Sequence, residues 1–130
     1  MREHSRQELE RKLLRRHPAE KVAQVLDELA DQDLQSDPRF TEQYIHFRKG
    51  RGFGPVRIRM ELAERGISAE LIARSLDAYS NEDWQHLMTE VAERKFGSSL
   101  PEDRREMARR GRFLASRGFS SWMISEYIFG

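Results

Sequence analysis

Positive charge is concentrated in one short segment of this 130-residue sequence. Residues 48–59 contain five cations and no carboxylate, whereas the remainder holds 18 of the chain's 23 cations and all 22 carboxylates. The five cations are Arg48, Lys49, Arg51, Arg57 and Arg59. Clustered cations attract phosphate groups or acidic protein surfaces. We therefore predict that this segment, with Phe53 in its glycine-rich turn, contacts a partner. A solvated turn and helix face is the alternative interpretation.

A second group of cations is expected on a single helix near the C-terminus. It consists of Arg104, Arg105, Arg109 and Arg112, with Arg110 and Arg117 close to them. Arginine presents a planar fork of donors that matches phosphate or carboxylate oxygens. This helix is a second candidate binding surface, and a face that only solubilises the protein is an equal alternative.

No set of residues in the sequence indicates catalysis or a bound cofactor. Cysteine is absent, which excludes disulfides, thiolate metal sites and thiol nucleophiles. The glycines within residues 50–54 lack the lysine of a phosphate-binding loop. Acidic residues within 31–42 approach the spacing of a calcium loop, but Ser36 replaces its glycine and Pro38 follows. We expect a non-enzymatic protein with no metal and no cofactor.

Composition favours a cytoplasmic protein. Charged residues make up 35% of the chain, and the net charge is +1. The longest run without a charged residue, 118–125, is far shorter than the ~20 apolar residues that cross a bilayer. The charged N-terminus also differs from a secretory signal. We expect one domain, residues 1–130, that is monomeric and does not enter a membrane.

Apolar residues recur every three or four positions along the chain, which predicts an all-α fold. Cap and turn residues divide it into eight short helices. Ser5 with Glu8 forms a capping box, Asp37 before Pro38 is expected to cap the third helix, and the seventh helix is expected over about 101–117. The first helix is expected to bury Leu9 and Leu13, and most aromatic residues are expected in the core: Phe40, Tyr44, Phe47, Trp84, Phe113 and Trp122.

The helices repeat with a period of about 50 residues. Residues 62–67 match residues 114–119 at an offset of 52, and Leu13 matches Leu62 at an offset of 49. The predicted unit is three helices, and the units cover about 4–49, 50–97 and 98–130, the last one incomplete. Short helices do not bury their apolar faces alone, so neighbouring units must stack. We expect an elongated, curved solenoid of right-handed type.

Residues 48–67, RKGRGFGPVRIRMELAERGI, resemble the central signature of the RecX family, bacterial regulators of the RecA recombinase. Further matches run through nearly the whole chain: Glu8-Leu9, Lys12-Leu13, Asp37, Arg39-Phe40, Asp83-Trp84, Lys95-Phe96-Gly97, Phe113-Leu114 and Arg117-Gly118-Phe119. His17-Pro18 departs from the glycine and apolar residue usual in the family at that turn. Family members usually have another helix in front, so we expect this chain to be truncated or to start late.

The resemblance implies a role in DNA recombination, DNA repair and the SOS response. It implies binding to RecA filaments on DNA, with inhibition of their ATPase, strand-exchange and co-protease activities and with filament shortening. Single-stranded DNA within the filament is a further implied partner. A long repeat protein can lie in the groove of a helical filament and touch several protomers at once. The alternative is a helical DNA- or RNA-binding module that acts without RecA.

Overall fold

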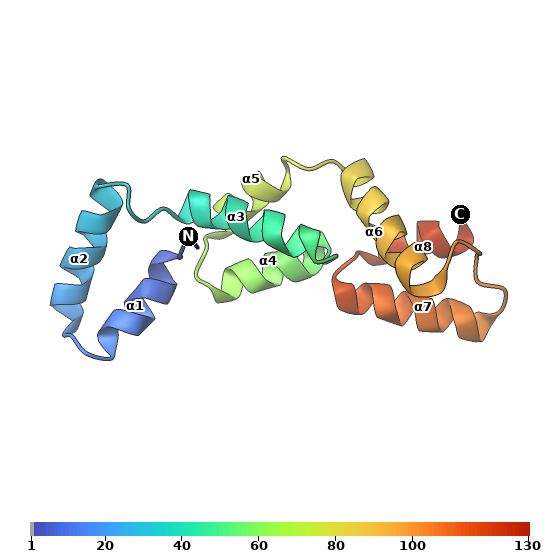
Figure 1. The fold of residues 1–130 in the computed structure, drawn as a ribbon, viewed down its shortest axis with the longest axis horizontal. Helices are drawn as coiled ribbons and strands as arrows, with labels where there is room; N and C mark the ends of the chain where they lie inside the picture. Colours follow the sequence, from blue (N-terminus) through green and yellow to red (C-terminus); the bar gives the residue numbers. More distant parts are fainter. Residues whose placement is uncertain (1) are drawn as a thin grey trace.

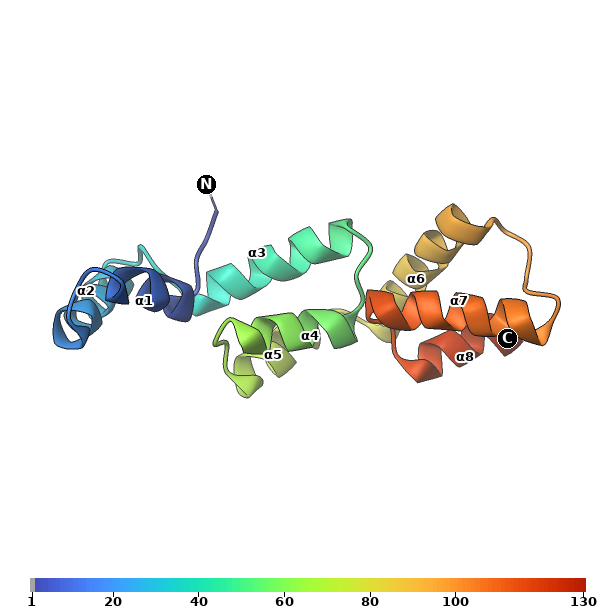
Figure 2. The same cartoon turned by 90° about the horizontal axis from the view of Figure 1, so that it is seen from below.

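The computed structural model describes residues 2–130, and all regular structure in that range is helical. The helices are α1 (Arg6–Leu14), α2 (Ala19–Asp31), α3 (Asp37–Gly50), α4 (Pro55–Glu64), α5 (Ala69–Leu76), α6 (Asn81–Phe96), α7 (Arg104–Arg117) and α8 (Ser121–Phe129). They follow one long axis, with α2 and α7 near opposite ends (Figures 1 and 2). The all-α, elongated repeat fold is confirmed, while its right-handed curvature stays a prediction.

Serine or aspartate side chains begin most of the helices by accepting a hydrogen bond from a backbone N–H of the first turn. The caps are Ser5, Ser36, Ser68, Ser80, Asp103 and Ser120. The predicted capping box of Ser5 and Glu8 is confirmed. The start of α7 lies at Arg104 rather than near residue 101, because Asp103 supplies its cap. Each cap contributes about 1 kcal/mol, so local sequence fixes where these short helices begin.

The cap of α3 differs from the prediction by one residue. Ser36, not Asp37, accepts the hydrogen bond from the backbone N–H of Arg39. Ser36 has the extended backbone that a cap requires, so the carboxylate of Asp37 is left to accept from the backbone N–H of Arg6 at 2.9 Å. Asp37 therefore ties the start of α1 to the start of α3.

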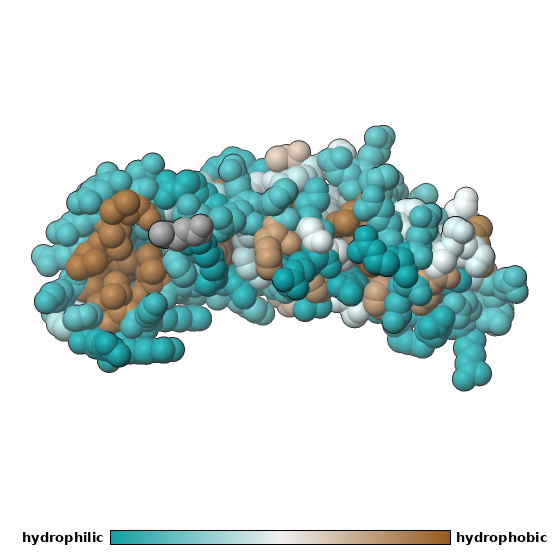
Figure 3. Space-filling view, viewed as in Figure 1, coloured by the Kyte–Doolittle hydropathy of each residue, from teal (hydrophilic) through white to brown (hydrophobic). Residues whose placement is uncertain are grey.

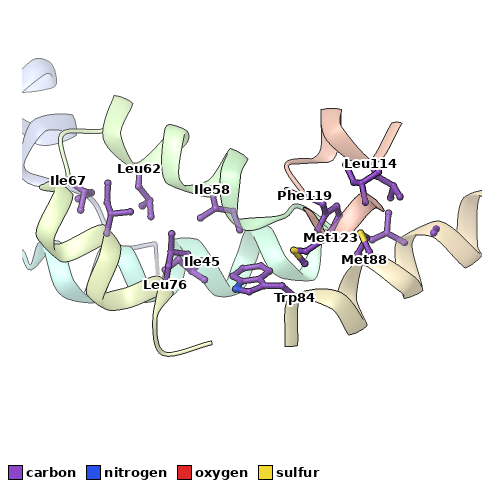
Figure 4. Close-up of a cluster of buried hydrophobic side chains, with 14 of the residues drawn as sticks. Ile45, Ile58, Leu62, Ile67, Leu76, Trp84, Met88, Leu114, Phe119 and Met123 are labelled. Atoms are coloured by element: carbon purple, nitrogen blue, oxygen red, sulfur yellow. The ribbon is translucent and has the colours of Figure 1, made fainter. Parts of the chain in front are cut away.

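One continuous hydrophobic core runs from α3 to α8. Phe40 and Trp84 are buried in it, as predicted. Figure 4 shows Trp84 of α6 between Ile45 and Ile58 on one side and Met123 of α8 on the other. Because α3 packs on α4 and α5, and α6 packs on α7, these side chains join both groups of helices into one packed body.

Two aromatic residues predicted for the core are exposed. The exposed fraction is 54% for Phe47 and 53% for Trp122, whereas Tyr44 and Phe113 are half-buried at the edge of the core. Phe47 lies two positions beyond the buried Ile45, which places it on the outer side of α3. The prediction was wrong for Phe47 and Trp122, and Phe47 becomes available for contact with a partner.

The helices α1 and α2 form a hairpin that buries less than the rest of the molecule. They pack on each other, and α1 has no fully buried residue. Leu9 and Leu13 are half-buried rather than buried, because α2 covers only one side of α1. Figure 3 shows an apolar area over this hairpin, and Leu14 and Leu34 are exposed.

The repeat places each of two glycine turns against the start of a helix in the preceding unit. At the C-terminal joint, defined as the contact of residues 54–57 with residues 116–118, the backbone N–H of Gly54 donates to the carbonyl of Arg117 at 2.8 Å. The N–H of Val56 donates to the carbonyl of Gly118 at 2.9 Å. Gly118 has a φ of +99°, and a Cβ there would lie 2.3 Å from the Cβ of Arg57. Glycine is therefore required at this turn.

The N-terminal joint is the contact of residues 5–7 with residues 65–66. The Oγ of Ser5 donates to the carbonyl of Arg65 at 2.9 Å. Gly66 has a φ of +83°, and a Cβ there would lie 2.6 Å from the Cβ of Gln7. Equivalent turns of the repeat thus hold neighbouring units together.

Candidate functional site

The basic segment predicted to contact a partner forms the turn between α3 and α4. Gly52, with a φ of +83°, allows the chain to reverse after α3, and the backbone N–H of Phe53 donates to the carbonyl of Arg48 at 3.1 Å. This turn brings the Phe53 ring back over α3. The guanidinium carbon of Arg48 lies 3.8 Å from the ring centroid.

The guanidinium groups of three arginines surround Phe53. Besides Arg48, the guanidinium of Arg57 lies 4.3 Å and that of Arg117 lies 4.9 Å from the ring centroid. Arg117 comes from α7, so this cluster spans the C-terminal joint. Cation–π contacts contribute about 0.5–2 kcal/mol each. The half-buried Phe53 thus holds these arginines beside one another.

Glu61 forms ion pairs with two of the five predicted contact cations. Its carboxylate accepts hydrogen bonds from Arg48 Nε at 2.9 Å and Nη2 at 2.8 Å, from Arg57 Nε at 3.1 Å and from the hydroxyl of Tyr44 at 2.8 Å. The segment contains no carboxylate, but this one follows two residues after it and one helical turn after Arg57. The spacing of Arg57 and Glu61 could have revealed the ion pair from the sequence.

The environment of Glu61 shifts the pKa of two groups. Burial alone would raise the pKa of Glu61, but hydrogen bonds from Arg48, Tyr44 and Arg57 outweigh it and leave the pKa below its ordinary value. Burial, together with the hydrogen bond to the Glu61 carboxylate, raises the pKa of Tyr44 to about 12. Near neutral pH Glu61 is therefore ionised and Tyr44 is protonated, so the hydrogen bonds of this cluster persist there.

The other three predicted contact cations have different surroundings. The ammonium of Lys49 lies 3.9 Å from the Tyr79 ring centroid. Arg51 is exposed, with its guanidinium 5.0 Å from the Phe47 ring centroid. Arg59 is exposed on α4, and none of the described residues pairs with its side chain. The basic segment thus divides into an inner half, Arg48 and Arg57, that is ion-paired and an outer half that is not. In the outer half Arg51 and Arg59 are exposed, whereas Lys49 is half-buried.

The second candidate surface on α7 is also only partly free. Hydrogen bonds from Arg109, and to a smaller extent from Arg110, lower the pKa of Glu106 to about 2. Arg110 is buried and also donates to the carbonyl of Ser99 at 2.7 Å and to the hydroxyl of Tyr127 at 2.8 Å. It is a structural residue. On α7, the exposed cations that form no ion pair with any described residue are Arg104, Arg105 and Arg112.

A hollow of about 630 Å³ lies beside the basic segment on α3. Its aromatic wall is Phe40, Tyr44 and Phe47, and its cations include Arg48 and Arg65. The guanidinium of Arg65 lies 4.9 Å from the Tyr44 ring centroid. Sequence reasoning missed Arg65 because it lies outside the segment 48–59 and reaches the hollow only through the fold.

Two other features bear on the class of protein. Within residues 2–130, none of the helices is both long enough and apolar enough to span a bilayer. The same residues contain no group of three or more acidic or histidine side chains placed to hold a metal ion.

Comparisons with known proteins identify the family. Residues 36–76 match the model of the second three-helix domain of RecX, and residues 81–128 match that of the third. The Regulatory protein RecX of Pseudomonas entomophila is 45% identical over 130 residues, which cover 99% of this chain and 83% of that protein. The chain belongs to the RecX family. The RecX protein of Pseudomonas fluorescens is 42% identical over the same shares of the two chains.

Solved RecX structures share the fold. The crystal structure of RecX from Lactobacillus salivarius superposes with a TM-score of 0.82 at 23% identity, covering 98% of this chain and 85% of that one. The RecX domain models group α3–α5 and α6–α8, whereas the units predicted from the sequence are residues 4–49, 50–97 and 98–130. Both groupings have the same period, and they differ in which helix starts a unit.

Proposed function

We propose that this RecX family member binds RecA filaments on DNA and lowers their ATPase, strand-exchange and co-protease activities. The observation that carries the proposal is the 45% identity to a protein named Regulatory protein RecX over nearly the whole chain. A regulatory protein that binds a filament needs no catalytic group of its own. Its role would lie in recombination, DNA repair and the SOS response, and we place it in the cytoplasm as a monomer.

The shape and the joints support this proposal. A rod of stacked helices can contact several protomers of a filament at once, and linked weak contacts then reinforce one another. That gain requires the contact points to keep their spacing. The continuous core of α3–α8 and the backbone hydrogen bonds between Gly54 and Arg117 and between Val56 and Gly118 hold that spacing.

We propose that the outer half of the basic segment makes the contact with the filament. Lys49, Arg51 and Arg59 would meet acidic groups, because their charges are not paired within residues 2–130. Arg48, Phe53 and Arg57 would position this surface through Glu61 and Arg117. On α7, Arg104, Arg105 and Arg112 are a second candidate, and Arg109 contributes less because it pairs with Glu106.

The test is RecA ATP hydrolysis on single-stranded DNA with the protein titrated in. We expect inhibition that saturates, and no inhibition by folded protein in excess would overturn the proposal. The double variant Arg51→Glu with Arg59→Glu should need at least about tenfold more protein for half-inhibition, since each lost charge pair contributes on the order of 1 kcal/mol. Arg57→Glu is unsuitable because it would place a carboxylate beside Glu61.

A matched control carries the same change of charge at the far end of the rod. Arg15 and Arg16 are exposed at the end of α1 and have no ion pair in the described part of the chain. Arg15→Glu with Arg16→Glu should inhibit like the unmodified protein. If both double variants lose inhibition equally, net charge rather than the basic segment controls binding.

A further inference from the structure

The hollow beside α3 has an aromatic wall that is closed at one end and open at the other. Its volume of about 630 Å³ lies within the range of about 300–1,000 Å³ that is typical of ligand pockets. Phe40, Tyr44 and Phe47 follow one another at spacings of four and three residues, so they share one side of α3. Phe40 is buried and Tyr44 is half-buried, whereas Phe47 is 54% exposed. An apolar group of a partner can therefore enter from the Phe47 end.

One cation of this hollow has no ion pair in the described part of the chain. Arg48 is paired with Glu61, and Arg2 is paired with Glu8 at 2.8 Å. The side chain of Arg65 is half-buried, and its only hydrogen bond within residues 2–130 runs from Nη1 to the carbonyl of Glu61 at 2.9 Å. The described residues that line the hollow include no carboxylate. The hollow thus carries an unpaired positive charge.

The remaining donors of Arg65 fit a carboxylate. Arg48 holds the two carboxylate oxygens of Glu61 with its Nε and Nη2. These are the two atoms of Arg65 that donate to no described residue. An arginine binds a carboxylate best through two parallel hydrogen bonds of this kind. A carboxylate of a partner would therefore meet Arg65 as Glu61 meets Arg48.

The hollow suits a peptide better than a strand of nucleic acid. A strand gains its affinity from several phosphate contacts at once, but the hollow offers one unpaired cation. A flat base also needs a flat ring surface, whereas the rings of Phe40 and Tyr44 are inclined to each other by 32°. One large apolar side chain beside one carboxylate satisfies both the aromatic wall and the unpaired Arg65.

We propose that this hollow binds an acidic peptide segment of a partner protein. A large apolar side chain of the peptide packs against Tyr44 and Phe47, and a neighbouring carboxylate accepts hydrogen bonds from Nε and Nη2 of Arg65. The binding requires neither RecA nor DNA. It is separate from the three cations proposed to meet the filament, since none of them lines the hollow.

The experiment titrates the full chain into a fluorescein-labelled peptide, in which phenylalanine is flanked by aspartates, and follows the anisotropy. Saturable binding is expected without RecA or DNA. Phe47→Ala should weaken it about tenfold at every salt concentration, because an apolar contact is lost. Arg65→Gln should also weaken it about tenfold, and binding should then depend less on salt, since salt screens the lost charge pair.

A changed peptide tests which groups meet. When asparagine replaces the aspartates, the unmodified protein should bind about tenfold more weakly, and Arg65→Gln should cause no further loss. When alanine replaces the phenylalanine, Phe47→Ala should likewise cause no further loss. Full additive losses in both cases would overturn the proposed arrangement, because the paired groups would then act independently.

Matched controls exist for both variants. Trp122→Ala removes an aromatic ring from α8 that is 53% exposed and does not line the hollow. Arg74→Gln removes an exposed cation of α5 that forms no ion pair with any described residue. Both should bind the peptide like the unmodified protein, with equal helicity of all variants by circular dichroism. Equal losses in a variant and its control would overturn the proposal in favour of diffuse binding.

Other occupants of the hollow would give different results. Tighter binding of an oligothymidine than of the peptide, weakened by both Phe47→Ala and Arg65→Gln, would overturn the proposal in favour of a nucleic acid. Self-association that sedimentation detects and Phe47→Ala abolishes would overturn it in favour of a second copy of the chain.

The outcome is separable from that of the proposed function. If the peptide does not bind but RecA hydrolysis is still inhibited, the peptide site is wrong and the role in RecA regulation stands. If the peptide binds as expected and RecA is unaffected, the peptide site stands and the role in RecA regulation is wrong.

Discussion

The two joints of this molecule occupy equivalent positions of the repeat but are built from different groups. Residues 5 and 7 of the N-terminal joint correspond to residues 54 and 56 of the C-terminal joint at an offset of 49, and residues 65–66 correspond to 117–118 at an offset of 52. In both, the start of one helix meets an Arg-Gly turn. The repeat therefore preserves the place of contact between units.

The donors at the two joints differ. The N-terminal joint uses a side chain, since the Oγ of Ser5 donates to the carbonyl of Arg65. The C-terminal joint uses the backbone N–H groups of Gly54 and Val56 and adds a hydrogen bond from Arg57 to the carbonyl of Ser116 at 3.0 Å. Position 54 is glycine where the equivalent position 5 is serine, and the backbone of residues 54–56 hydrogen-bonds directly to the backbone of residues 117–118. The C-terminal joint therefore belongs to the continuous core, while α1 contributes no fully buried residue.

Gly118→Ala should have the largest effect on stability. A left-handed φ costs alanine about 1–2 kcal/mol, and the new Cβ would also collide with the Cβ and backbone nitrogen of Arg57. We expect a loss of about 3 kcal/mol in the free energy of unfolding, measured by urea denaturation. Gly50→Ala is the control, since Gly50 has no positive φ and no atom lies within 4 Å of the added Cβ. It should change the free energy of unfolding by less than about 0.5 kcal/mol. Equal losses would show that the C-terminal joint does not hold the units together.

Ser5→Ala should have a smaller effect that stays local to α1. It removes the cap of α1 and leaves the carbonyl of Arg65 without its donor, at a cost of about 1.5 kcal/mol. Amide hydrogen exchange should become faster in α1 and stay unchanged in α6–α8. Ser68→Ala removes a cap alone and should cost about 1 kcal/mol at α5. Faster exchange throughout the chain would contradict the view that the N-terminal joint is separable from the core.

Much of the fold follows from local sequence. The capping box at Ser5 and the match of residues 62–67 to 114–119 predict the helices and their period, because caps and turns depend on neighbouring residues. The ion pairs of Arg48 did not follow, since Glu61 lies on the next helix and reaches Arg48 only after the turn has folded. A count of charges along the chain therefore overestimates the basic surface.

The small hollow lined by Arg51, Arg94, Lys95 and Arg117 could not be predicted from the sequence for a related physical reason. Arg51, Arg94 and Arg117 are far apart in the chain, and only the stacking of α3, α6 and α7 brings them together. Each of them alone is an arginine near the end of a helix, a position at which a cation interacts favourably with the helix dipole. Residues that meet only across the contact between two units are not recognised as neighbours until that contact is known.

Glu61→Gln should have the smallest effect and should depend on pH. Because Arg57 contacts both Glu61 and the carbonyl of Ser116, the Glu61 carboxylate supports the C-terminal joint. At the N-terminal joint the equivalent of Arg57 is Glu8, whose carboxylate completes the capping box instead. Loss of the charge at position 61 should therefore lower stability by about 1 kcal/mol at pH 7, through the pairs with Arg57 at the C-terminal joint and with Arg48 on α3, and should leave the N-terminal joint unchanged.

The pH dependence of this effect has a defined sign. The pKa of Glu61 in the folded protein is below its ordinary value of 4.5, so ionised Glu61 stabilises the fold above that pH. This contribution is lost as the pH falls through the lowered pKa, and the difference between the protein and Glu61→Gln should shrink there. Glu64→Gln is the control, because Glu64 is exposed on the same helix and no ion pair to it occurs within residues 2–130. A difference that stays constant from pH 7 to below 4.5 would mean that the geometry of the side chain, rather than its charge, supports the joint.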